Sequence, residues 1–309
     1  MQKANIPLKQ VFFEIVGKCN AKCTYCVTGN GSQTGSFVNI KKFKETINSL
    51  YERKIVDSNT NFSLFNWGEP FLHPNFNEIV SFLSDQNIRF SLSSNLSVIP
   101  KNIDKDSFKS LENLTISMPG FSQNSYSKIH GFNFYKILEN INTLSKIIPT
   151  EKMQVAYHLY QFNIAEIRLA QEYFKHSHIK VFSSFAYFND YNMATNYLNN
   201  LLTREEMNQM AKELLLFYVD DLIAKMPPDY LCPQFQYMNI DENCNVIHCC
   251  VAPKNSKDYL VGEANSIDIN KLNKRYKSAI CKECNKTKLV YWAHNTGKIS
   301  TEFIYGILK

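Results

Sequence analysis

Three cysteines lie within eight residues of one another in the segment EIVGKCNAKCTYCVTG, residues 14–29. Cys19, Cys23 and Cys26 have the spacing C-x-x-x-C-x-x-C, and no His or Cys follows closely enough to act as a fourth ligand. Four thiolates complete an iron–sulfur cluster or a structural zinc site, whereas three leave one metal position open. A zinc site would lack a ligand here, so the spacing favours a [4Fe–4S] cluster with one iron free to bind another molecule.

Six further cysteines lie in the C-terminal quarter, so the chain of 309 residues has nine in all. The N-terminal MQKANIPLKQ has no apolar signal core, and the longest apolar run, LLLFYV at residues 214–219, is too short to span a membrane. We therefore expect a cytoplasmic protein with no membrane association. In that reducing compartment, clustered cysteines indicate metal or redox chemistry rather than disulfides.

The charge pattern argues against a nucleic-acid partner. The net charge of +6 is mild for this length, and the lysines are spread singly along the sequence. A nucleic-acid-binding protein more often carries a dense basic stripe. We expect the lysines to form an ordinary solvated surface.

Short apolar runs alternate with longer amphipathic segments through the first two thirds of the chain, which is typical of strands followed by helices. The six expected strands cover residues 10–16, 61–67, 89–95, 113–118, 153–160 and 179–188. Four expected helices cover residues 41–54, 75–86, 135–148 and 164–176. This alternation predicts an α/β fold, a partial (β/α)6 TIM-type barrel over residues 1–200, with its reactive groups at the carboxyl ends of the strands.

The alternation of expected strands and helices ends after residue 200. Residues 203–225 predict one long connecting helix within 201–228, with Thr203 as N-cap and Glu206 completing a capping box. Residues 229–309 hold six cysteines in irregular sequence and predict a small cysteine-rich domain. The last residues, with Trp292, are expected to pack against this domain.

The cluster motif, with the aromatic Tyr25 before its last cysteine, resembles the signature of radical S-adenosylmethionine (SAM) enzymes. NWGEP at residues 66–70 resembles that family's GGEP motif, with Trp67 in place of the first Gly. The segments SLSSNLS (91–97) and ISMPGFSQNSYSKIHG (116–131) resemble its later strand-end motifs. The resemblance implies that SAM chelates the open iron of a [4Fe–4S] cluster held by Cys19, Cys23 and Cys26, and is cleaved to a 5′-deoxyadenosyl radical that abstracts hydrogen from a C–H bond.

The resemblance also implies a set of SAM-binding residues. Tyr25 and the GGEP-like loop are expected around the methionine end of SAM. Ser93 and Asn95, at the third strand, are expected near its carboxylate or ribose, and Ser117 is expected to face the ribose. Either of two basic residues, Lys128 or His130, approaches the carboxylate. The expected residues are Tyr25, Gly68, Glu69, Pro70, Ser93, Asn95, Ser117, Lys128, His130 and Asn163.

The C-terminal cysteines resemble the SPASM pattern in its shorter, twitch form, which implies one auxiliary [4Fe–4S] cluster ligated by Cys232, Cys249, Cys281 and Cys284. Cys244 stands at the usual glycine position of that pattern. Cys250 is the rival of Cys249, and the two point to opposite faces if they lie on a strand. Zinc is the alternative metal for a four-cysteine set.

A cluster with four protein ligands has no open iron, so its expected role is electron transfer. The chain most resembles the twitch-type dehydrogenase that oxidises an aminocyclitol alcohol, and this resemblance implies an oxidoreductase that dehydrogenates a sugar-like or aminocyclitol-like alcohol, with a flavodoxin or ferredoxin as reductant. The alternatives are an epimerase in which Cys244 or Cys250 donates a hydrogen atom, and a peptide-modifying enzyme. The peptide reading is weaker because the first strand starts too early for the leader-binding domain that many such relatives carry. A non-enzymatic iron–sulfur protein is the alternative from another class.

Two other side chains are candidates for contact with the substrate. His158 alternates with apolar neighbours near the end of a strand and could face the barrel interior or be a satisfied core histidine. Glu14 projects from the first expected strand near the cluster loop and could be a carboxylate on the substrate side. The sequence assigns no general base.

Overall fold

The structure, a computed structural model, describes residues 6–29, 33, 35–295 and 306. Its centre is a nine-stranded sheet in the order β6-β5-β4-β3-β2-β1-β7-β8-β9. The first six strands are parallel and lie in chain order, as expected for a partial TIM-type barrel. These six strands are β1 (Gln10–Phe13), β2 (Asn61–Ser63), β3 (Phe90–Ser94), β4 (Leu111–Met118), β5 (Met153–Leu159) and β6 (Lys180–Phe185).

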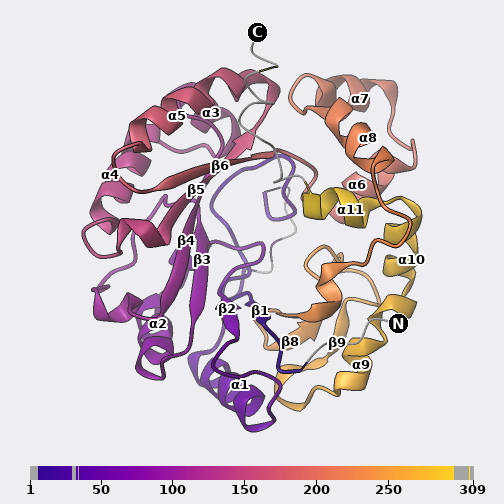
Figure 1. Ribbon diagram of the computed structural model, residues 1–309. Coiled ribbons are helices and arrows are strands. Elements are labelled where there is room, and N and C mark those ends of the chain that lie inside the picture. The colour runs from indigo at the N-terminus through magenta and orange to yellow at the C-terminus, as the bar shows by residue number, and fades with distance from the viewer. Residues whose placement is uncertain (1–5, 30–32, 34, 296–305, 307–309) are drawn as a thin grey trace.

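Helices cover the outer face of this curved sheet (Figure 1). Those of the barrel are α1 (Ile40–Glu52), α2 (Phe76–Asp85), α3 (Gln123–Ile129), α4 (Phe134–Leu144) and α5 (Ile167–Phe174). The expected helices correspond to α1, α2, α4 and α5. The short α3 was not expected, and β3 connects to β4 through a 3-10 turn, Asp106–Phe108, instead of a helix.

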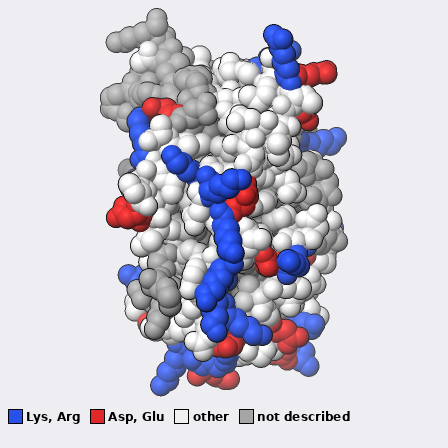
Figure 2. Space-filling view, turned by 90° about the vertical axis from the view of Figure 1, so that its right-hand side faces the viewer, with Lys and Arg blue, Asp and Glu red and all other residues white. Residues whose placement is uncertain are grey.

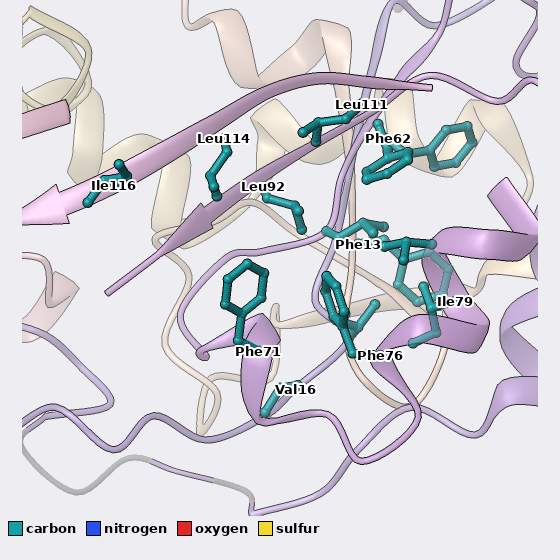
Figure 3. Close-up of a cluster of buried hydrophobic side chains, with 14 of the residues drawn as sticks. Phe13, Val16, Phe62, Phe71, Phe76, Ile79, Leu92, Leu111, Leu114 and Ile116 are labelled. Carbon is teal, nitrogen blue, oxygen red and sulfur yellow. The ribbon is translucent and has the colours of Figure 1, made fainter. Parts of the chain in front are cut away.

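The core lies between the sheet and these helices. Phe13, Phe62 and Leu92 from neighbouring strands meet Phe76 and Ile79 of α2 (Figure 3), and all five are 1% exposed or less. Burying each such side chain contributes about 1.5–3 kcal/mol. This packing fixes the strand ends, from which the functional loops project.

The sheet continues beyond the barrel, which the sequence did not predict. Strand β7 (Tyr237–Ile240) pairs parallel with β1, and Phe12 lies opposite Asn239. Strands β8 (Asn245–Ile247) and β9 (Leu260–Glu263) then add antiparallel to β7. The cysteine-rich region is thus built on the same sheet as the barrel.

The remaining helices lie on the right of Figure 1, around this extension. They are α6 (Tyr191–Leu198), α7 (Arg204–Ala211), α8 (Leu216–Ala224), α9 (Ile269–Asn273), α10 (Ala279–Lys286) and α11 (Leu289–Asn295). Trp292 of α11 is 1% exposed and packs edge-on against Tyr187 and Phe188. The rest of the expected C-terminal packing segment, 296–305 and 307–309, lies outside the described residues.

The expectation of one helix over residues 203–225 is wrong. The Thr203–Glu206 capping box is present, but the segment forms α7 and α8 with a break between them. Gln161 takes the backbone carbonyls at the break: its N–H donates to Glu213 O at 2.8 Å and its Nε2 donates to Leu214 O at 3.0 Å. Because these carbonyls are bonded outside the segment, the helix ends there, which a local periodicity cannot reveal.

Candidate active site

The three-cysteine segment, residues 19–29, lies across the carboxyl ends of the barrel strands and is held from several sides. Cys26 forms a bridge with Asn189 beyond β6: Asn189 N–H donates to Tyr25 O at 2.7 Å, and Val27 N–H donates to Asn189 O at 3.1 Å. Thr28 Oγ1 donates to Trp67 O at 2.9 Å. These bonds position the loop between the end of β6 and the loop after β2.

The three thiols form one electrostatic group. Burial raises the pKa of Cys19 to about 11, with the neighbouring Cys26 contributing in the same direction. The pKa of Cys23 is also raised by burial, and next by Cys26 and Cys19. The thiols of Cys19 and Cys23 are therefore neutral on their own, and become thiolates when a bound cation replaces the proton.

The NWGEP loop, residues 66–70, is fixed by hydrogen bonds to its backbone. Glu14 Oε1 accepts from the N–H groups of both Trp67 and Gly68 at 2.9 Å, and Glu69 N–H donates to Lys18 O at 2.9 Å. A Cβ on Gly68 would lie 1.7 Å from Val16 O, so no side chain fits there. Glycine is needed at Gly68 for this close backbone approach, and Trp67 at the preceding position leaves it intact.

Glu69 and Asn95 connect this loop to the third strand and to the cluster loop. The Glu69 carboxylate is 3% exposed and accepts from Phe71 N, Ser94 Oγ and Asn95 N, and Pro70 begins the short helix that follows. Asn95 Nδ2 donates to Asn20 Oδ1 at 3.1 Å and lies 3.6 Å from Cys19 Sγ. Burial raises the pKa of Glu69 to about 7.

His158 lies between serines of the two neighbouring strands. Its Nε2 is 3.2 Å from Ser117 Oγ and its Nδ1 is 3.2 Å from Ser184 Oγ. Burial lowers the pKa of His158 to about 4, so the imidazole is neutral at pH 7. Ser93 lies one strand further on, opposite Thr115 in the β3–β4 register. The expected Ser93, Ser117 and His158 therefore come from three successive strands.

Three expected SAM-binding residues have other partners. Lys128 forms an ion pair with Glu213 at 3.5 Å and lies 4.2 Å from the ring centre of Phe162. His130 caps the end of α3 and is buried, which lowers its pKa to about 3. Asn163 Nδ2 donates to the carbonyls of Pro119 and His158, while its Oδ1 accepts from Tyr160 N–H. These contacts favour a structural role for Lys128 and Asn163, because neighbouring groups of the chain occupy their polar atoms.

Tyr25 and Glu14 also differ from expectation. Tyr25 is 5% exposed, and its hydroxyl donates to Glu213 Oε2 at 2.9 Å, which ties the cluster loop to the break between α7 and α8. Glu14, expected on the substrate side, is 1% exposed. Its Oε2 lies 3.9 Å from Lys254 Nζ, and Glu242 Oε2 lies 3.7 Å from the same nitrogen. Glu14 therefore fixes the NWGEP loop and belongs to a buried group of charges with Glu242 and Lys254.

Five of the C-terminal cysteines line one cavity of about 230 Å³. Cys232 precedes the turn Pro233–Gln236, Cys249 follows β8, and Cys281 and Cys284 lie one helical turn apart on α10. Cys249, Cys232 and Cys281 all raise the pKa of Cys284, and Cys249 and Cys281 also raise the pKa of Cys232. Cys250 also lines the cavity and perturbs neither Cys281 nor Cys284.

Cys244 lies elsewhere. It occupies the turn between β7 and β8 with a φ of +64°, the left-handed conformation that glycine adopts easily. Its thiol hydrogen-bonds Thr46 on α1 and does not line the cavity. Cys244 thus has the backbone conformation that its glycine position in the pattern implies, but its thiol lies away from the cavity that the other C-terminal cysteines line.

The cavity joins the two cysteine regions. Phe65, Asn66 and Trp67 of the loop after β2 line it together with the C-terminal thiols and with Asn189, which pairs with the cluster loop. The sequence did not single out Asn189, His248, Arg275 or His294, which also line it. The nearness in sequence of these His and Arg residues to the C-terminal cysteines was the only hint of their position. A single sequence does not show which of them line the cavity. Among the described side chains, no group of three or more His, Cys, Asp and Glu converges as for a single metal ion.

The lysines, although separate in the sequence, align in space. Figure 2, which shows the side formed by the C-terminal region, has a row of Lys and Arg down its centre with a few acidic side chains beside it. The exposed lysines of α9, α10 and the turn between them are Lys271, Lys274, Lys277, Lys282 and Lys286. No helix in the described part of the chain is long and apolar enough to cross a membrane.

Comparison with known proteins identifies relatives of limited similarity. The S-adenosylmethionine-dependent nucleotide dehydratase of Selenomonas ruminantium is 27% identical over 45% of this chain, and the subtilosin biosynthesis protein AlbA of Bacillus subtilis is 27% identical over 29%. These matches span only 49% and 19% of the two relatives.

The fold has solved counterparts. SuiB of Streptococcus suis, crystallised with S-adenosylmethionine, superposes with a TM-score of 0.59 over 89% of this chain and 67% of that one, at 12% identity. The same protein has been solved with its precursor peptide SuiA. At this identity the likeness concerns the fold alone.

A sequence profile described as the Radical SAM superfamily matches residues 13–173, which is more than half of the chain. The matched region runs from the end of β1 to α5 and includes the three-cysteine loop, the NWGEP loop and the strand ends described above. This chain belongs to the radical SAM superfamily.

Proposed function

We propose that this chain is a radical SAM oxidoreductase that oxidises an alcohol carbon of a small sugar-like or aminocyclitol-like substrate, with an auxiliary [4Fe–4S] cluster as electron acceptor. One observation carries the proposal: a single cavity is lined both by the NWGEP loop and by Cys232, Cys249, Cys281 and Cys284. An electron acceptor held by these thiols would therefore lie next to a loop of the expected SAM-binding region.

The cluster loop fits the group that its family binds. Three neighbouring half-buried thiols, Cys19, Cys23 and Cys26, would hold three irons, and SAM would bind the fourth. The neutral thiols of Cys19 and Cys23 are consistent with a metal site, because a bound cation supplies the charge that ionises them. When bound, the cluster and SAM together supply the radical that removes a hydrogen atom from a substrate C–H bond.

The C-terminal thiols fit a second cluster with four protein ligands. Cys232, Cys249, Cys281 and Cys284 influence one another electrostatically, whereas Cys250 interacts with Cys249 and Cys232 only. We therefore assign Cys249, rather than Cys250, to the ligand set.

The proposed oxidation balances as follows. The alcohol carbon loses a hydrogen atom to the deoxyadenosyl group, the hydroxyl loses its proton to a base, and the remaining electron passes to the acceptor at the four thiols. The product is the carbonyl compound, with methionine and 5′-deoxyadenosine. One electron from an external reductant is needed to cleave SAM.

His294 of α11 is the candidate base. It lines the cavity, and its Nδ1 is buried without a hydrogen-bond partner among the described residues. Burial lowers the pKa of His294, so its imidazole is neutral and able to accept a proton at pH 7. His158, also neutral, is already bonded through both nitrogens to Ser117 and Ser184.

Epimerisation is the second candidate, and Cys250 is the observation that favours it. This thiol lines the cavity, is not needed for a four-cysteine ligand set, and could return a hydrogen atom to a substrate radical. Cys244 is not proposed for this role because it lies against α1.

A peptide substrate is supported only by relatives. AlbA is a bacteriocin biosynthesis protein, and SuiB binds the precursor peptide SuiA. The aromatic cavity wall formed by Phe12, Phe65 and Phe235 would suit either a sugar ring or an apolar peptide side chain.

We propose a small acidic redox protein, a flavodoxin or ferredoxin, as the reductant. The exposed lysines of α9 and α10 support it, since opposite charges accelerate association.

Product analysis in deuterated solvent tests the proposal. The reconstituted enzyme, SAM and a reductant are incubated with candidate alcohols and peptides, and 5′-deoxyadenosine is measured with the product. A carbonyl product without solvent deuterium on carbon supports dehydrogenation. Deuterium at an inverted carbon, lost in Cys250→Ala, supports epimerisation instead. Failure to cleave SAM when reduced would leave a non-enzymatic iron–sulfur protein.

A further inference from the structure

Arg275 is a buried cation at the wall of the cavity that holds the C-terminal thiols. It is 4% exposed and lines that cavity. Its guanidinium donates to four backbone carbonyls: Nε to Leu272 O at 3.0 Å, Nη1 to His248 O at 2.5 Å, and Nη2 to Gln234 O at 2.9 Å and Tyr237 O at 3.0 Å. The acceptors come from three segments, which are α9, the residue after β8 and the stretch from Gln234 to Tyr237, so the side chain is fixed in position.

This cation has no acidic partner in the described part of the chain. None of the ion pairs there includes Arg275, and its hydrogen-bond acceptors are all uncharged carbonyls. A buried charge without a counter-charge is costly, by several kcal/mol in typical proteins. A fixed, uncompensated guanidinium beside a cavity therefore indicates that the cavity receives an anion.

The thiols supply that anion when they bind iron. Burial lowers the pKa of Arg275, whereas Cys249, Cys232 and Cys281, in that order of effect, raise it. The interaction is mutual, since Arg275 lowers the pKa of Cys232, Cys249 and Cys281. A cluster ligated by four thiolates carries net negative charge.

We propose that Arg275 is the built-in counter-charge of the auxiliary cluster and raises its reduction potential, so that the cluster accepts an electron from the substrate radical. The proposal rests on the proposed auxiliary cluster. The reduced cluster carries one more negative charge than the oxidised one, so a nearby fixed cation stabilises the reduced form more. Net charge and hydrogen bonds to the sulfurs are the terms that set such potentials.

His248 belongs to the same arrangement. Its carbonyl accepts from Arg275, and its Nε2 lies 3.2 Å from both Cys281 Sγ and Ser278 Oγ. Removing Arg275 therefore also frees the backbone next to a thiol. A test must separate the charge of Arg275 from its hydrogen bonds.

The experiment uses the full chain with Cys19, Cys23 and Cys26 replaced by Ala, so that any remaining cluster is the auxiliary one. In this background we compare Arg275, Arg275→Lys, which keeps the charge, and Arg275→Gln, which keeps a hydrogen-bond donor. Iron content and folding by circular dichroism are measured first. The midpoint potential then comes from an EPR-monitored redox titration, which does not depend on turnover.

We expect Arg275→Gln to retain iron with a more negative midpoint, and Arg275→Lys to stay closer to the parent. An unchanged midpoint in Arg275→Gln, or equal shifts in both variants, overturns the proposal. If Arg275→Gln loses its iron, the Arg275→Lys variant distinguishes the outcomes. Retained iron with a midpoint potential near that of the parent supports the charge role of Arg275, whereas loss of iron and fold in both variants overturns the proposal. No iron in the parent would instead refute the auxiliary cluster.

Discussion

The side chain of Asn95, at the carboxyl end of β3, reaches the first cysteine of the cluster loop: its Nδ2 lies 3.6 Å from Cys19 Sγ. The backbone N–H of the same residue donates to Glu69 of the NWGEP loop at 2.7 Å. One residue thus connects the expected cluster ligand to the loop expected to bind SAM. A shift of either loop is transmitted to the other.

Replacing Asn95 by Ala is expected to weaken iron binding at the cluster loop by about 10-fold, since partners of metal ligands typically contribute this much. The variant loses its bonds to Cys19 and Asn20 but keeps its backbone bond to Glu69. Iron retention during chelator challenge measures the effect. Asn113→Ala is the matched control. It also removes an asparagine side chain that donates a hydrogen bond, because Asn113 Nδ2 on β4 donates to Ser91 Oγ on β3. Equal retention in both variants would contradict the expectation.

Gly68→Ala is expected to abolish measurable SAM binding while Gly262→Ala preserves it. A Cβ at Gly68 would lie 1.7 Å from the backbone oxygen of Val16, whereas at Gly262 it would meet the Ile267 side chain at 3.3 Å. The first contact forces the NWGEP loop to move, and the second needs only a small side-chain shift. Equilibrium binding of SAM to the anaerobic, iron-loaded variants checks this. Normal affinity in Gly68→Ala would disprove the importance of the close approach.

Glu14 makes stability depend on pH. Burial raises its pKa from 4.5 to about 7; Lys254 opposes the shift, Glu242 adds to it, and Tyr259 is the other titratable group nearby. Because the folded state binds the proton more tightly, this contribution is present below pH 4.5 and is lost as the pH rises through 7. The shift corresponds to about 3 kcal/mol.

Anaerobic urea unfolding at pH 5 and pH 7.5 tests this for the wild type and Glu14→Gln. The glutamine is uncharged throughout and can still accept from the backbone of Trp67 and Gly68. We expect a smaller loss of unfolding free energy between the two pH values in Glu14→Gln. A parallel pH dependence in the two proteins would exclude Glu14 as its source.

Iron counting tests the two cysteine sets. Two [4Fe–4S] clusters give about eight irons per chain, falling to about four in the Cys19/Cys23/Cys26→Ala variant and to about four in Cys232/Cys284→Ala. Cys244→Ala, the matched control, is expected to keep about eight because Cys244 lies against α1. Four irons in the wild type and none in the triple variant would refute the auxiliary cluster, and zinc in the C-terminal set would replace it.

Charge reversal of Lys274 and Lys277 is expected to slow reduction by an acidic flavodoxin about 10-fold at low salt and to weaken its salt dependence. Both lysines are exposed next to the buried Arg275. Stopped-flow reduction of the loaded enzyme measures the rate. Lys105→Glu and Lys109→Glu, two exposed lysines between β3 and β4, form the control pair. Equal slowing in both pairs would indicate a general charge effect rather than docking.

The local signals predicted the barrel well. Apolar residues marked all six parallel strands: β3 and β5 are buried along most of their length, although β6 exposes Lys180 and Phe182. The strand at 61–67 was drawn too long, since only Asn61–Ser63 pairs and NWG leaves the sheet to meet Glu14. Pairing of this kind is a tertiary property that an apolar run does not encode.

The site was predictable where residue types follow from chemistry, as in the two cysteine sets. It was not predictable where distant segments decide the contacts. Asn163 looked like a ligand-side amide, yet Tyr160, Pro119 and His158 take its polar atoms. Nothing in the sequence distinguishes Arg275 from the other basic residues, and its burial follows from tertiary contacts with four backbone carbonyls.

The parallel pairing of β1 with β7 has a consequence for synthesis. The first strand of the chain lies between β2 and a strand that is made only after the whole barrel has left the ribosome. Until then β1 has one open edge, and the loop that carries Cys19 leaves from its end. Pairing of such distant segments is slow and leaves the nascent sheet prone to aggregation. The last third of the chain therefore supplies β7, which pairs with the open edge of β1. Truncation before residue 237 would leave that edge exposed in the finished protein.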